Sequence, residues 1–459
     1  MPLTVQTDTI AAPATPPGRG GIGIIRVSGP LALSIFQKIT HKKEIFPRKA
    51  LHCSFYDHLN EAMDMGLVLF FNQPHSFTGE DVIEFQGHGG PVVMDYLLSQ
   101  ILHYGARLAK PGEFSERAFL NDKIDLAQAE AIADLIDSAS TQAAKSALRS
   151  LQGEFSKRIA DMVNRLIHLR IYVEAAIDFP DEEVDFLTDG VVNQQLSDLI
   201  IALSAILNTA IQGARLREGL TIVIVGKPNA GKSSLLNQLS GRESAIVTDI
   251  AGTTRDLVKE QILLDGVPLH IIDTAGLRES LDPIEQEGIR RARAEMEKAD
   301  LILLLVDATM VDKPLSEEKT AALIASYGLE GRELTLILNK IDLLPAGTLQ
   351  SDYEGLIPHY CLSAKSGEGM TALRQHLVEK TGIQSHQEGQ FIARRRHLDV
   401  LERVLNLLKE AKCQFDSAPM GELLAEDLRY AQHYLQEITG EFTADDLLGK
   451  IFSSFCIGK

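Results

Sequence analysis

The sequence has few cysteines and no long apolar run, and both absences narrow the class of protein. Its four cysteines, Cys53, Cys361, Cys413 and Cys456, lie far apart and include no C-x-x-C pair, which excludes a zinc knuckle and a disulfide framework. No run of apolar residues reaches the roughly 20 residues needed to span a bilayer. The first residues, Met1 to Gln6, lack the basic and apolar regions of a signal peptide. We therefore expect a cytoplasmic protein with reduced thiols.

The sequence also has fewer basic residues than acidic ones, 45 Lys and Arg against 63 Asp and Glu. The formal net charge is −18 over 459 residues, whereas nucleic-acid phosphates are bound by clustered Lys and Arg. This argues against non-specific nucleic-acid binding over the whole surface and leaves only local basic patches. One such patch, Arg394 to Arg396, either contacts RNA phosphates or starts a solvated helix, and the second interpretation is favoured. The length indicates about three domains.

The motif with the clearest chemistry runs from Gly226 to Ser234 and reads G-K-P-N-A-G-K-S-S. It follows a β-branched apolar run, Leu220 to Val225, and precedes Leu235 to Leu239, which has helical character. A glycine loop between a strand and a helix wraps a phosphate chain with backbone N–H groups. In this pattern Lys232 reaches the terminal phosphates and Ser233 holds Mg²⁺.

Four more motifs follow in the order expected of a GTP-binding domain. Asp249 to Arg255 is a polar loop in which a threonine completes the Mg²⁺ shell, and Asp273 to Gly276 places an acid beside the metal and a glycine N–H beside the γ-phosphate. Asn339 to Asp342, N-K-I-D, ends a strand, and its aspartate accepts two hydrogen bonds that guanine supplies and adenine does not. Ser363 to Lys365 supports the base from behind.

The predicted ligand contacts of this domain are drawn from all five motifs. The GTP-binding residues are Asn229, Ala230, Gly231, Lys232, Ser233, Ser234, Thr248, Asp249, Ile250, Ala251, Gly252, Thr253, Thr254, Asp273, Thr274, Ala275, Gly276, Asn339, Lys340, Asp342, Ser363, Ala364 and Lys365. The Mg²⁺ ligands among them are Ser233 and Thr254.

The residue that activates water for hydrolysis is less obvious. Many GTPases carry a glutamine directly after D-x-A-G, but Leu277 occupies that position and has no polar group. Glu285 is the nearest plausible substitute, and the alternative is a solvated glutamate at a helix start. The positive charge that the transition state needs comes either from Arg255 or Arg278, or from a monovalent cation held by Asn229 and nearby carbonyls.

Periodicity predicts two further domains around this one. Residues 1–120 alternate strand and helix, with strands at Ile22 to Val27, Leu67 to Phe71 and Val82 to Gln86, and helices at Pro91 to Leu102 and Ser115 to Leu120. Residues 121–216 and 383–459 carry apolar residues at helical spacing, and neither block looks complete alone. We therefore predict an α/β N-terminal domain and a discontinuous all-α domain, into which a Ras-like α/β P-loop domain, 217–382, is inserted.

A glycine-rich junction interrupts the N-terminal domain. Gly87-His88-Gly89-Gly90 follows a predicted strand and precedes Pro91, a favoured first residue of a helix. Such a junction either binds an anion or simply turns the chain, and the structural interpretation is favoured.

Taken together, the polar loop Asp249 to Arg255, Leu277 and the sequences on both sides of the P-loop domain resemble the MnmE (TrmE) family of tRNA modification GTPases. The resemblance covers essentially the whole chain. Further markers of this resemblance are Gly18 to Gly23, Phe77 to Asp81, Gly87 to Gly90, Lys110 to Phe114 and the terminal Phe455 to Lys459. The resemblance implies an N-terminal domain that binds a tetrahydrofolate derivative, 5,10-methylene- or 5-formyl-tetrahydrofolate, through Arg26, Glu84, Lys123 and Lys459, and that forms a homodimer.

The resemblance also implies how the protein works. K⁺ would be held by Asn229, Thr248, Ile250 and Thr253, GTP hydrolysis would be activated by dimerisation of the G domains, and Glu285 would be catalytic. The implied partner is the FAD-dependent protein MnmG (GidA), with which the protein would add an aminomethyl or carboxymethylaminomethyl group to C5 of the wobble uridine of certain tRNAs. Cys456 would be a conjectured catalytic thiol, and a buried passive thiol is an equal alternative.

Two other functions share some of these motifs. A ribosome-assembly GTPase has the same central motifs but usually appends a basic RNA-binding module, which the acidic flanking blocks do not resemble. A folate-dependent one-carbon enzyme, in which GTP is only regulatory, is the second alternative.

Overall fold

The computed structural model describes residues 8–178, 190–240, 259–264, 266–273, 297, 299–311, 316–345, 347–349, 351, 357–381, 391–441, 445–453, 455 and 458. The chain divides into two compact units. The first joins Met1–Ala133, Ser150–Leu203 and Val400–Lys459, and the second joins Asp134–Arg149 and Ser204–Asp399.

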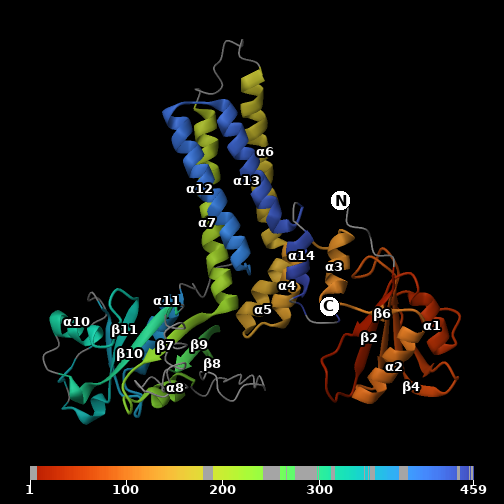
Figure 1. Ribbon diagram of the computed structural model, residues 1–459, viewed down its shortest axis with the longest axis horizontal. Helices are drawn as coiled ribbons and strands as arrows, with labels where there is room; N and C mark the ends of the chain where they lie inside the picture. Colours follow the sequence, from red (N-terminus) through yellow and green to blue (C-terminus); the bar gives the residue numbers. More distant parts are fainter. Residues whose placement is uncertain are drawn as a thin grey trace, which may run out of the picture. The chain divides into compact units, whose positions relative to one another are not determined.

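The N-terminal part of the first unit is built on a six-stranded sheet with the order β3-β4-β5-β2-β1-β6 (Figure 1). Its strands are β1 Ile10–Pro13, β2 Gly23–Ser28, β3 Leu51–Tyr56, β4 Ala62–Phe71, β5 Val82–Gly87 and β6 Arg107–Leu108. Neighbouring strands are antiparallel except β1 and β6, which are parallel. The helices of this part are α1 Ala32–Thr40, α2 Pro91–His103 and α3 Glu113–Leu120.

This sheet confirms the predicted α/β domain and adds elements that the sequence did not indicate. The predicted strands correspond to β2, β4 and β5, and the predicted helices to α2 and α3, with bounds that differ by up to five residues. The structure adds β1, β3 and α1. In α1 the apolar residues Ile35, Phe36 and Ile39 are fully buried, so this helix closes one face of the sheet.

In the segment Gly87 to Gly90, which begins at the last residue of β5, close backbone packing explains the need for glycine at position 89. A Cβ atom on Gly89 would lie 2.7 Å from the carbonyl oxygens of Gly20 and Ile22, and the Gly20 N–H donates to the Gly89 carbonyl at 3.1 Å. His88 Nδ1 lies 2.6 Å from an oxygen of Asp64, whose second oxygen accepts from the His88 N–H at 2.8 Å. These contacts favour the structural interpretation of the junction.

A cluster of ion pairs around the buried Arg117 and Glu113 joins two of the segments that mark the family resemblance. Arg117, which is 5% exposed, donates through Nη1 to Glu80 at 3.0 Å and through Nη2 to Asp8 at 2.7 Å and Glu113 at 3.1 Å. Glu113 also accepts from Arg107 Nη1 at 2.8 Å and from the Lys110 N–H at 2.8 Å. The Phe77 to Asp81 and Lys110 to Phe114 segments are therefore tied together by carboxylate–guanidinium pairs.

We expect Glu113→Gln to lower the free energy of unfolding of this unit by about 2 kcal/mol at neutral pH, because it weakens a buried charge-assisted network. Burial raises the pKa of Glu113, but hydrogen bonds from Arg107, Lys110 and Arg117 outweigh it and hold the pKa below 4.5. The stabilisation is therefore complete above pH 4.5 and is lost as the pH falls through the lowered pKa of the folded state.

Urea denaturation of the full chain at pH 7 and at acidic pH, followed by circular dichroism, tests this expectation. Glu116→Gln is the matched control, because burial and the neighbouring Glu113 raise the pKa of Glu116 in the same helix. The control should unfold at the wild-type urea concentration or slightly above. A Glu113→Gln midpoint equal to wild type at pH 7 would contradict the stabilising role of the network.

The helical part of the first unit is assembled from segments distant in sequence, as the predicted insertion requires. Its long helices are α6 Glu154–Asp178, the first part of α7 Val191–Glu218, most of α12 Arg395–Ser417 and α13 Gly421–Thr439. Its shorter helices are most of α4 Leu126–Ile136 and α14 Asp445–Ser453. Arg170 of α6 donates to Gln432 of α13 at 2.7 Å across 262 residues of sequence. On α12, the predicted apolar face is confirmed, since Leu401, Val404 and Leu408 are fully buried.

By length and composition, α7 is apolar enough to cross a membrane, with a mean hydropathy of 1.5 over its best 18-residue window, of which 44% is buried. The core helix of a soluble protein passes the same test. Buried residues on α7 recur at helical spacing at Val192, Leu196, Leu199 and Leu203. This pattern is typical of a helix with one face against a protein core.

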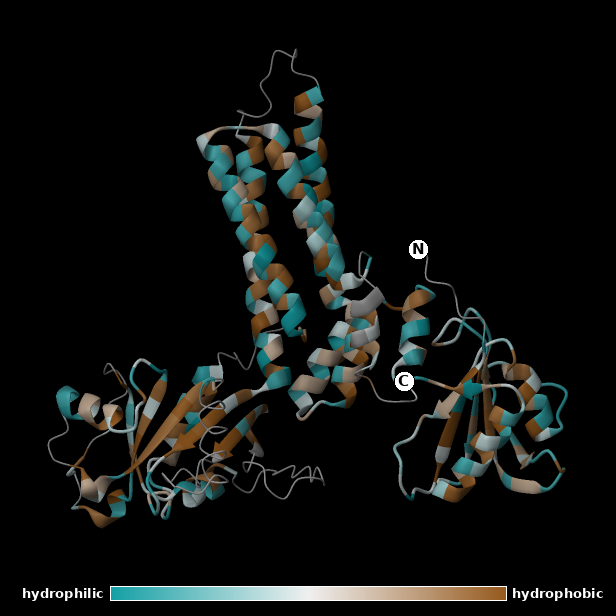
Figure 2. Ribbon diagram, viewed as in Figure 1, coloured by the Kyte–Doolittle hydropathy of each residue, from teal (hydrophilic) through white to brown (hydrophobic). Residues whose placement is uncertain are grey.

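The second unit contains a six-stranded sheet with the order β12-β11-β10-β7-β9-β8. Its strands are β7 Leu220–Val225, β8 Lys259–Leu264, β9 Val267–Asp273, β10 Leu301–Asp307, β11 Leu334–Asn339 and β12 His359–Leu362. All pairs are parallel except β8 with β9. The described helices include α8 Lys232–Ser240, α10 Glu317–Ala325 and α11 Met370–Thr381. Figure 2 shows hydrophobic residues concentrated along the central strands. The parallel pairs confirm the predicted Ras-like α/β fold of this part of the chain.

A single buried carboxylate joins three segments of this second unit. Asp134, 6% exposed, accepts from Arg217 Nε at 2.7 Å and from Arg394 Nη2 at 2.8 Å. Arg395 begins α12, is largely exposed and lies 3.2 Å from Asp399. The cluster Arg394 to Arg396 therefore lies at the start of a helix, which is the interpretation that the sequence favoured. Arg394 has a structural role, because it binds the buried Asp134.

Cysteine placement agrees with the expected reduced thiols. Cys53 and Cys361 are buried free thiols and Cys413 is an exposed free thiol. Cys456 lies outside the described residues.

Candidate functional site

The phosphate loop lies between β7 and α8, as the sequence predicts. At its two glycines the backbone approaches other chain segments: a Cβ atom on Gly226 would lie 2.5 Å from the Leu305 carbonyl oxygen, and one on Gly231 would lie 2.2 Å from Asn339 Nδ2. Gly231 has φ +102° and Asn229 has φ 65°, conformations that glycine and asparagine tolerate best. The sequence G-K-P-N-A-G therefore fits the loop it forms.

The charged and hydroxyl groups of the loop gather at the start of α8. Lys232 is 8% exposed and donates through Nζ to the Gly226 carbonyl at 2.7 Å, so its ammonium lies over the loop. Ser233 and Ser234 are exposed in the first turn. An ammonium, an exposed hydroxyl and helix N–H groups at one place match the chemistry of a phosphate chain and its Mg²⁺.

The predicted base-recognition loop lies at the end of β11, and Asn339 fixes it to the phosphate loop. Asn339, 2% exposed, donates through Nδ2 to the Ala230 carbonyl at 2.7 Å and accepts at Oδ1 from the Ala364 N–H at 2.9 Å. Its amide therefore joins the phosphate loop, the N-K-I-D segment and the Ser363 to Lys365 segment. These three segments, far apart in sequence, are brought together as predicted.

The remaining members of this loop differ in exposure. Asp342 lies in the short 3-10 helix η2 Ile341–Leu343 and is exposed to solvent, so its carboxylate is available to a base. Ser363 is fully buried and its Oγ accepts from the Ser366 N–H at 3.2 Å. Lys365 is exposed. Ser363 thus shapes the turn, whereas Asp342 and Lys365 face outwards.

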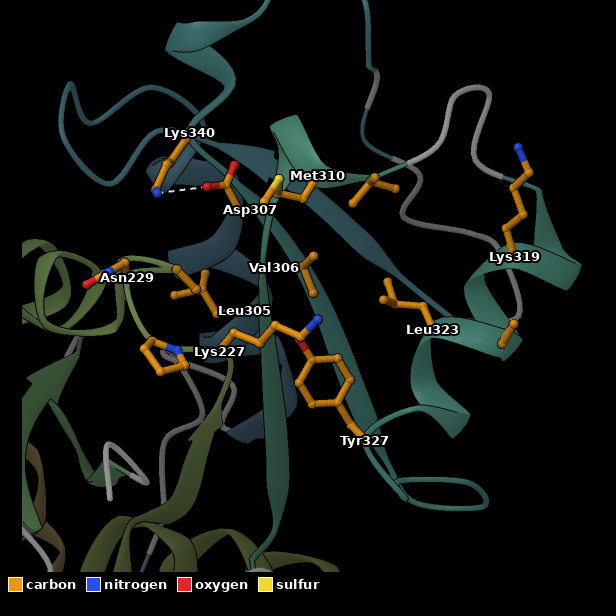
Figure 3. Close-up of a pocket in the computed structure, with 14 residues that line it drawn as sticks. Lys227, Asn229, Leu305, Val306, Asp307, Met310, Lys319, Leu323, Tyr327 and Lys340 are labelled. Atoms are coloured by element: carbon orange, nitrogen blue, oxygen red, sulfur yellow. Dashed lines mark hydrogen bonds and ion pairs between the residues drawn. The ribbon is translucent and has the colours of Figure 1, made fainter. Parts of the chain in front are cut away.

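A cavity of about 610 Å³ adjoins the phosphate loop (Figure 3). The loop residues Lys227 and Asn229 line one side, and Leu323 of α10 lines the other. Tyr327, from the turn after α10, lies beside Lys227. Lys340 borders the cavity and forms an ion pair with Asp307, which no sequence motif indicated. The cavity and the predicted nucleotide site therefore share residues of the phosphate loop.

Several predicted site residues lie outside the described residues. They are Thr248, Asp249, Ile250, Ala251, Gly252, Thr253, Thr254, Thr274, Ala275, Gly276, Glu285, Cys456 and Lys459. The backbone of Asp273 ends β9, next to β7 in the sheet. The roles predicted for these residues stay predictions.

Three of the residues predicted to bind folate, Arg26, Glu84 and Lys123, line a second cavity of about 510 Å³ in the first unit. Arg26 Nε donates to Glu84 at 3.0 Å across the β2–β5 pair. The Arg26 guanidinium lies 5.8 Å from the Phe77 ring centroid and 5.7 Å from that of Phe114, so two aromatic rings and a carboxylate fix its position. Lys123 lines the same cavity.

The cavity also contains residues that sequence reasoning missed. Phe71 and Phe77 supply aromatic walls, and Arg48 adds a third cation and donates through Nη2 to the His75 carbonyl at 3.1 Å. An aromatic cavity with more cations than carboxylates suits a flat, anionic ligand. Arg48 lies on a loop that carries no recognisable motif, so only the three-dimensional structure places it at the cavity.

The phosphate loop after β7 and the N-K-I-D loop after β11, joined by Asn339 in a mostly parallel sheet, define a P-loop protein of the GTP-binding class. The helical segments match a family model described as "MnmE helical domain" over residues 126–456, and the N-terminal segment matches one described as "GTP-binding protein TrmE N-terminus" over residues 9–123. The chain belongs to the MnmE (TrmE) family.

Curated relatives extend this match over the whole chain. The "tRNA modification GTPase MnmE" of Vibrio cholerae is 58% identical over 99% of this chain and 100% of its own length. The protein of the same name from Saccharophagus degradans is 56% identical over 100% of both chains. Among solved structures, Era from Aquifex aeolicus bound to GDP·AlF4⁻ is 24% identical over 41% of this chain and 67% of its own, with a TM-score of 0.29. The family assignment does not depend on that structure.

Proposed function

We propose that this chain hydrolyses GTP, an acid anhydride, and uses the hydrolysis in tRNA modification in the cytoplasm. The observation that carries the proposal is the full-length identity of 58% to a tRNA modification GTPase, combined with a phosphate loop and a guanine-type loop joined by Asn339. Purified protein incubated with GTP and Mg²⁺ tests the hydrolytic part, because a chain that releases no phosphate from GTP is not a GTPase.

In the proposed reaction, Mg²⁺ supplies charge neutralisation at the phosphates, and Ser233 and Thr254 would hold it. Lys232 would bind the terminal phosphates, and the Gly276 N–H would donate to the γ-phosphate. Asp342 recognises guanine, because its exposed carboxylate accepts hydrogen bonds from two neighbouring N–H groups of that base. Glu285 orients the attacking water where Leu277 offers no polar group.

The proposed modification is the addition of an aminomethyl or carboxymethylaminomethyl group to C5 of the wobble uridine, carried out with an FAD-dependent partner of the MnmG (GidA) type. The proposal rests on the family and includes a homodimer formed by the N-terminal domain. The one-carbon unit would come from a tetrahydrofolate derivative.

The cavity around Arg26 supports tetrahydrofolate as the N-terminal ligand. The Arg26–Glu84 pair presents both a donor and an acceptor, Phe71 and Phe77 offer flat apolar surface, and Lys123 adds positive charge. A tetrahydrofolate carries a polar heterocycle, an aromatic ring and two carboxylates, so each part meets a matching group. Lys459 is proposed to join this site from the chain terminus.

We expect the full-length protein to bind 5-formyl-tetrahydrofolate, and Lys123→Gln to weaken binding by about 10-fold, because one cation opposite an anionic ligand is removed. Isothermal titration calorimetry measures both affinities. Lys49→Gln is the matched control: it also removes one lysine charge, and Lys49 lies over the Phe46 ring rather than in the cavity lining. No binding by wild type, or equal losses in the two variants, would contradict the folate site.

A further inference from the structure

The ion pair at the edge of the large cavity joins the ends of two neighbouring strands. Asp307 is the last residue of β10 and is in register with Asn339, the last residue of β11. The next residue, Lys340, has φ 67°, and its Nζ lies 2.7 Å from Asp307 Oδ2. Figure 3 shows the two side chains directed at each other beside the phosphate loop.

The Asp307 carboxylate is itself fixed in position. Its Oδ1 accepts from the Thr309 N–H at 2.9 Å and from the Thr309 hydroxyl at 2.7 Å, which leaves Oδ2 for Lys340. Burial raises the pKa of Asp307, but the hydrogen bonds from Lys340 and Thr309 outweigh it, so the group is ionised at neutral pH. The hydrogen bonds from Thr309 therefore orient the Asp307 carboxylate, and this carboxylate holds the Lys340 ammonium.

We propose that Asp307 is a positioning residue of the nucleotide site, which holds Lys340 in one rotamer before the nucleotide arrives. A lysine without a partner samples many rotamers, and a ligand that must order it loses affinity. Lys340 belongs to the same loop as Asn339 and Asp342. A fixed Lys340 side chain therefore keeps this loop ready to bind the base. The inference rests on the proposed binding of guanine nucleotides by this loop.

Three features of nucleotide binding should follow. Asp307→Ala should weaken the binding of GDP and of GTP by the same factor of about 10. The two factors are equal because the lost charge-assisted hydrogen bond lies on the base side of the site, where GDP and GTP are identical. The KM for GTP should rise while kcat at saturation stays within about twofold. The ratio of GTP to ITP affinity should stay constant, because the exocyclic amine of guanine is read by Asp342.

A double-mutant cycle on the full-length protein separates this role from a general effect on the fold. Fluorescence titration with mant-GDP in Mg²⁺ would be carried out on wild type, Asp307→Ala, Lys340→Ala and the double variant. If Asp307 acts through Lys340, Asp307→Ala has no further effect in the Lys340→Ala background. Asp307→Asn keeps an oxygen acceptor but removes the negative charge, so it should lose part of the affinity in the wild-type background and none in the Lys340→Ala background. This second cycle carries the test if the alanine variant does not fold.

Asp300→Ala is the matched control, because Asp300 precedes the other end of β10 and accepts from the Thr221 N–H at 2.8 Å. This variant should bind mant-GDP like wild type. The proposal is overturned if the Asp307 and Lys340 losses add, if Asp300→Ala loses as much affinity as Asp307→Ala, or if Asp307→Ala binds normally. Failure of wild type to bind mant-GDP would instead overturn the proposed function.

Discussion

Glu285→Ala should lower the rate of GTP hydrolysis by about 100-fold or more while the affinity for GTP stays within about threefold of wild type. The reason is the position after D-x-A-G, where Leu277 has no group that can orient water. Glu285 is proposed to take that role without touching the phosphates in the ground state. Single-turnover hydrolysis and mant-nucleotide binding, measured on the same preparation, separate the two quantities.

Two variants make the Glu285 result interpretable. Glu285→Gln keeps the shape and a hydrogen-bonding group but loses the base, so it should fall between wild type and alanine. Lys232→Ala should lose nucleotide affinity as well as hydrolysis, because it removes the ammonium that lies over the phosphate loop. Unchanged turnover in Glu285→Ala would clear this residue of the catalytic role and leave it a solvated glutamate.

GTP hydrolysis should be at least about 10-fold faster in K⁺ than in Na⁺ at equal ionic strength, because a cation held beside the phosphates stabilises charge that develops in the transition state. Asn229, exposed and in the left-handed conformation on the phosphate loop, is the described residue of the proposed K⁺ site. Thr248, Ile250 and Thr253 would complete the site. The preference should be measured as initial rates of phosphate release across a concentration series of each salt.

Asn229→Ala should bring the K⁺ rate down towards the Na⁺ rate, because it removes one of the proposed ligands. Arg255→Ala and Arg278→Ala test the alternative source of positive charge and should leave the ratio of the two rates unchanged. Equal rates in the two salts for wild type would remove the cation from the mechanism. A collapse of hydrolysis in either arginine variant would then identify the group that replaces it.

Local motifs explain why the nucleotide site was predictable from sequence. The run Leu220 to Val225, the glycine loop and the apolar residues after it each have the composition that their conformation requires, so the strand, loop and helix were found in place. Asn339 was predicted from the N-K-I-D motif. Its bridge to Ala230 and Ala364 was not, because it depends on how β11 and β12 lie beside the phosphate loop.

Elements stabilised by distant partners were harder to predict. In β3, Leu51–Tyr56, polar and apolar residues are mixed at an edge of the sheet, and the strand is specified by its pairing with β4. The pairing of β2 with β5 joins Arg26 to Glu84 across 58 residues of sequence. Asp307 belongs to no motif, and only the register of β10 with β11 places it beside Lys340.

The central claim is that this chain acts in modification of the wobble uridine, and nucleoside mass spectrometry of tRNA tests it most directly. The tRNA would be taken from a strain that lacks the gene, with and without the gene restored. The account predicts that C5-substituted wobble uridines disappear on deletion and return on restoration. An unchanged nucleoside profile would contradict the account and favour a ribosome-assembly GTPase.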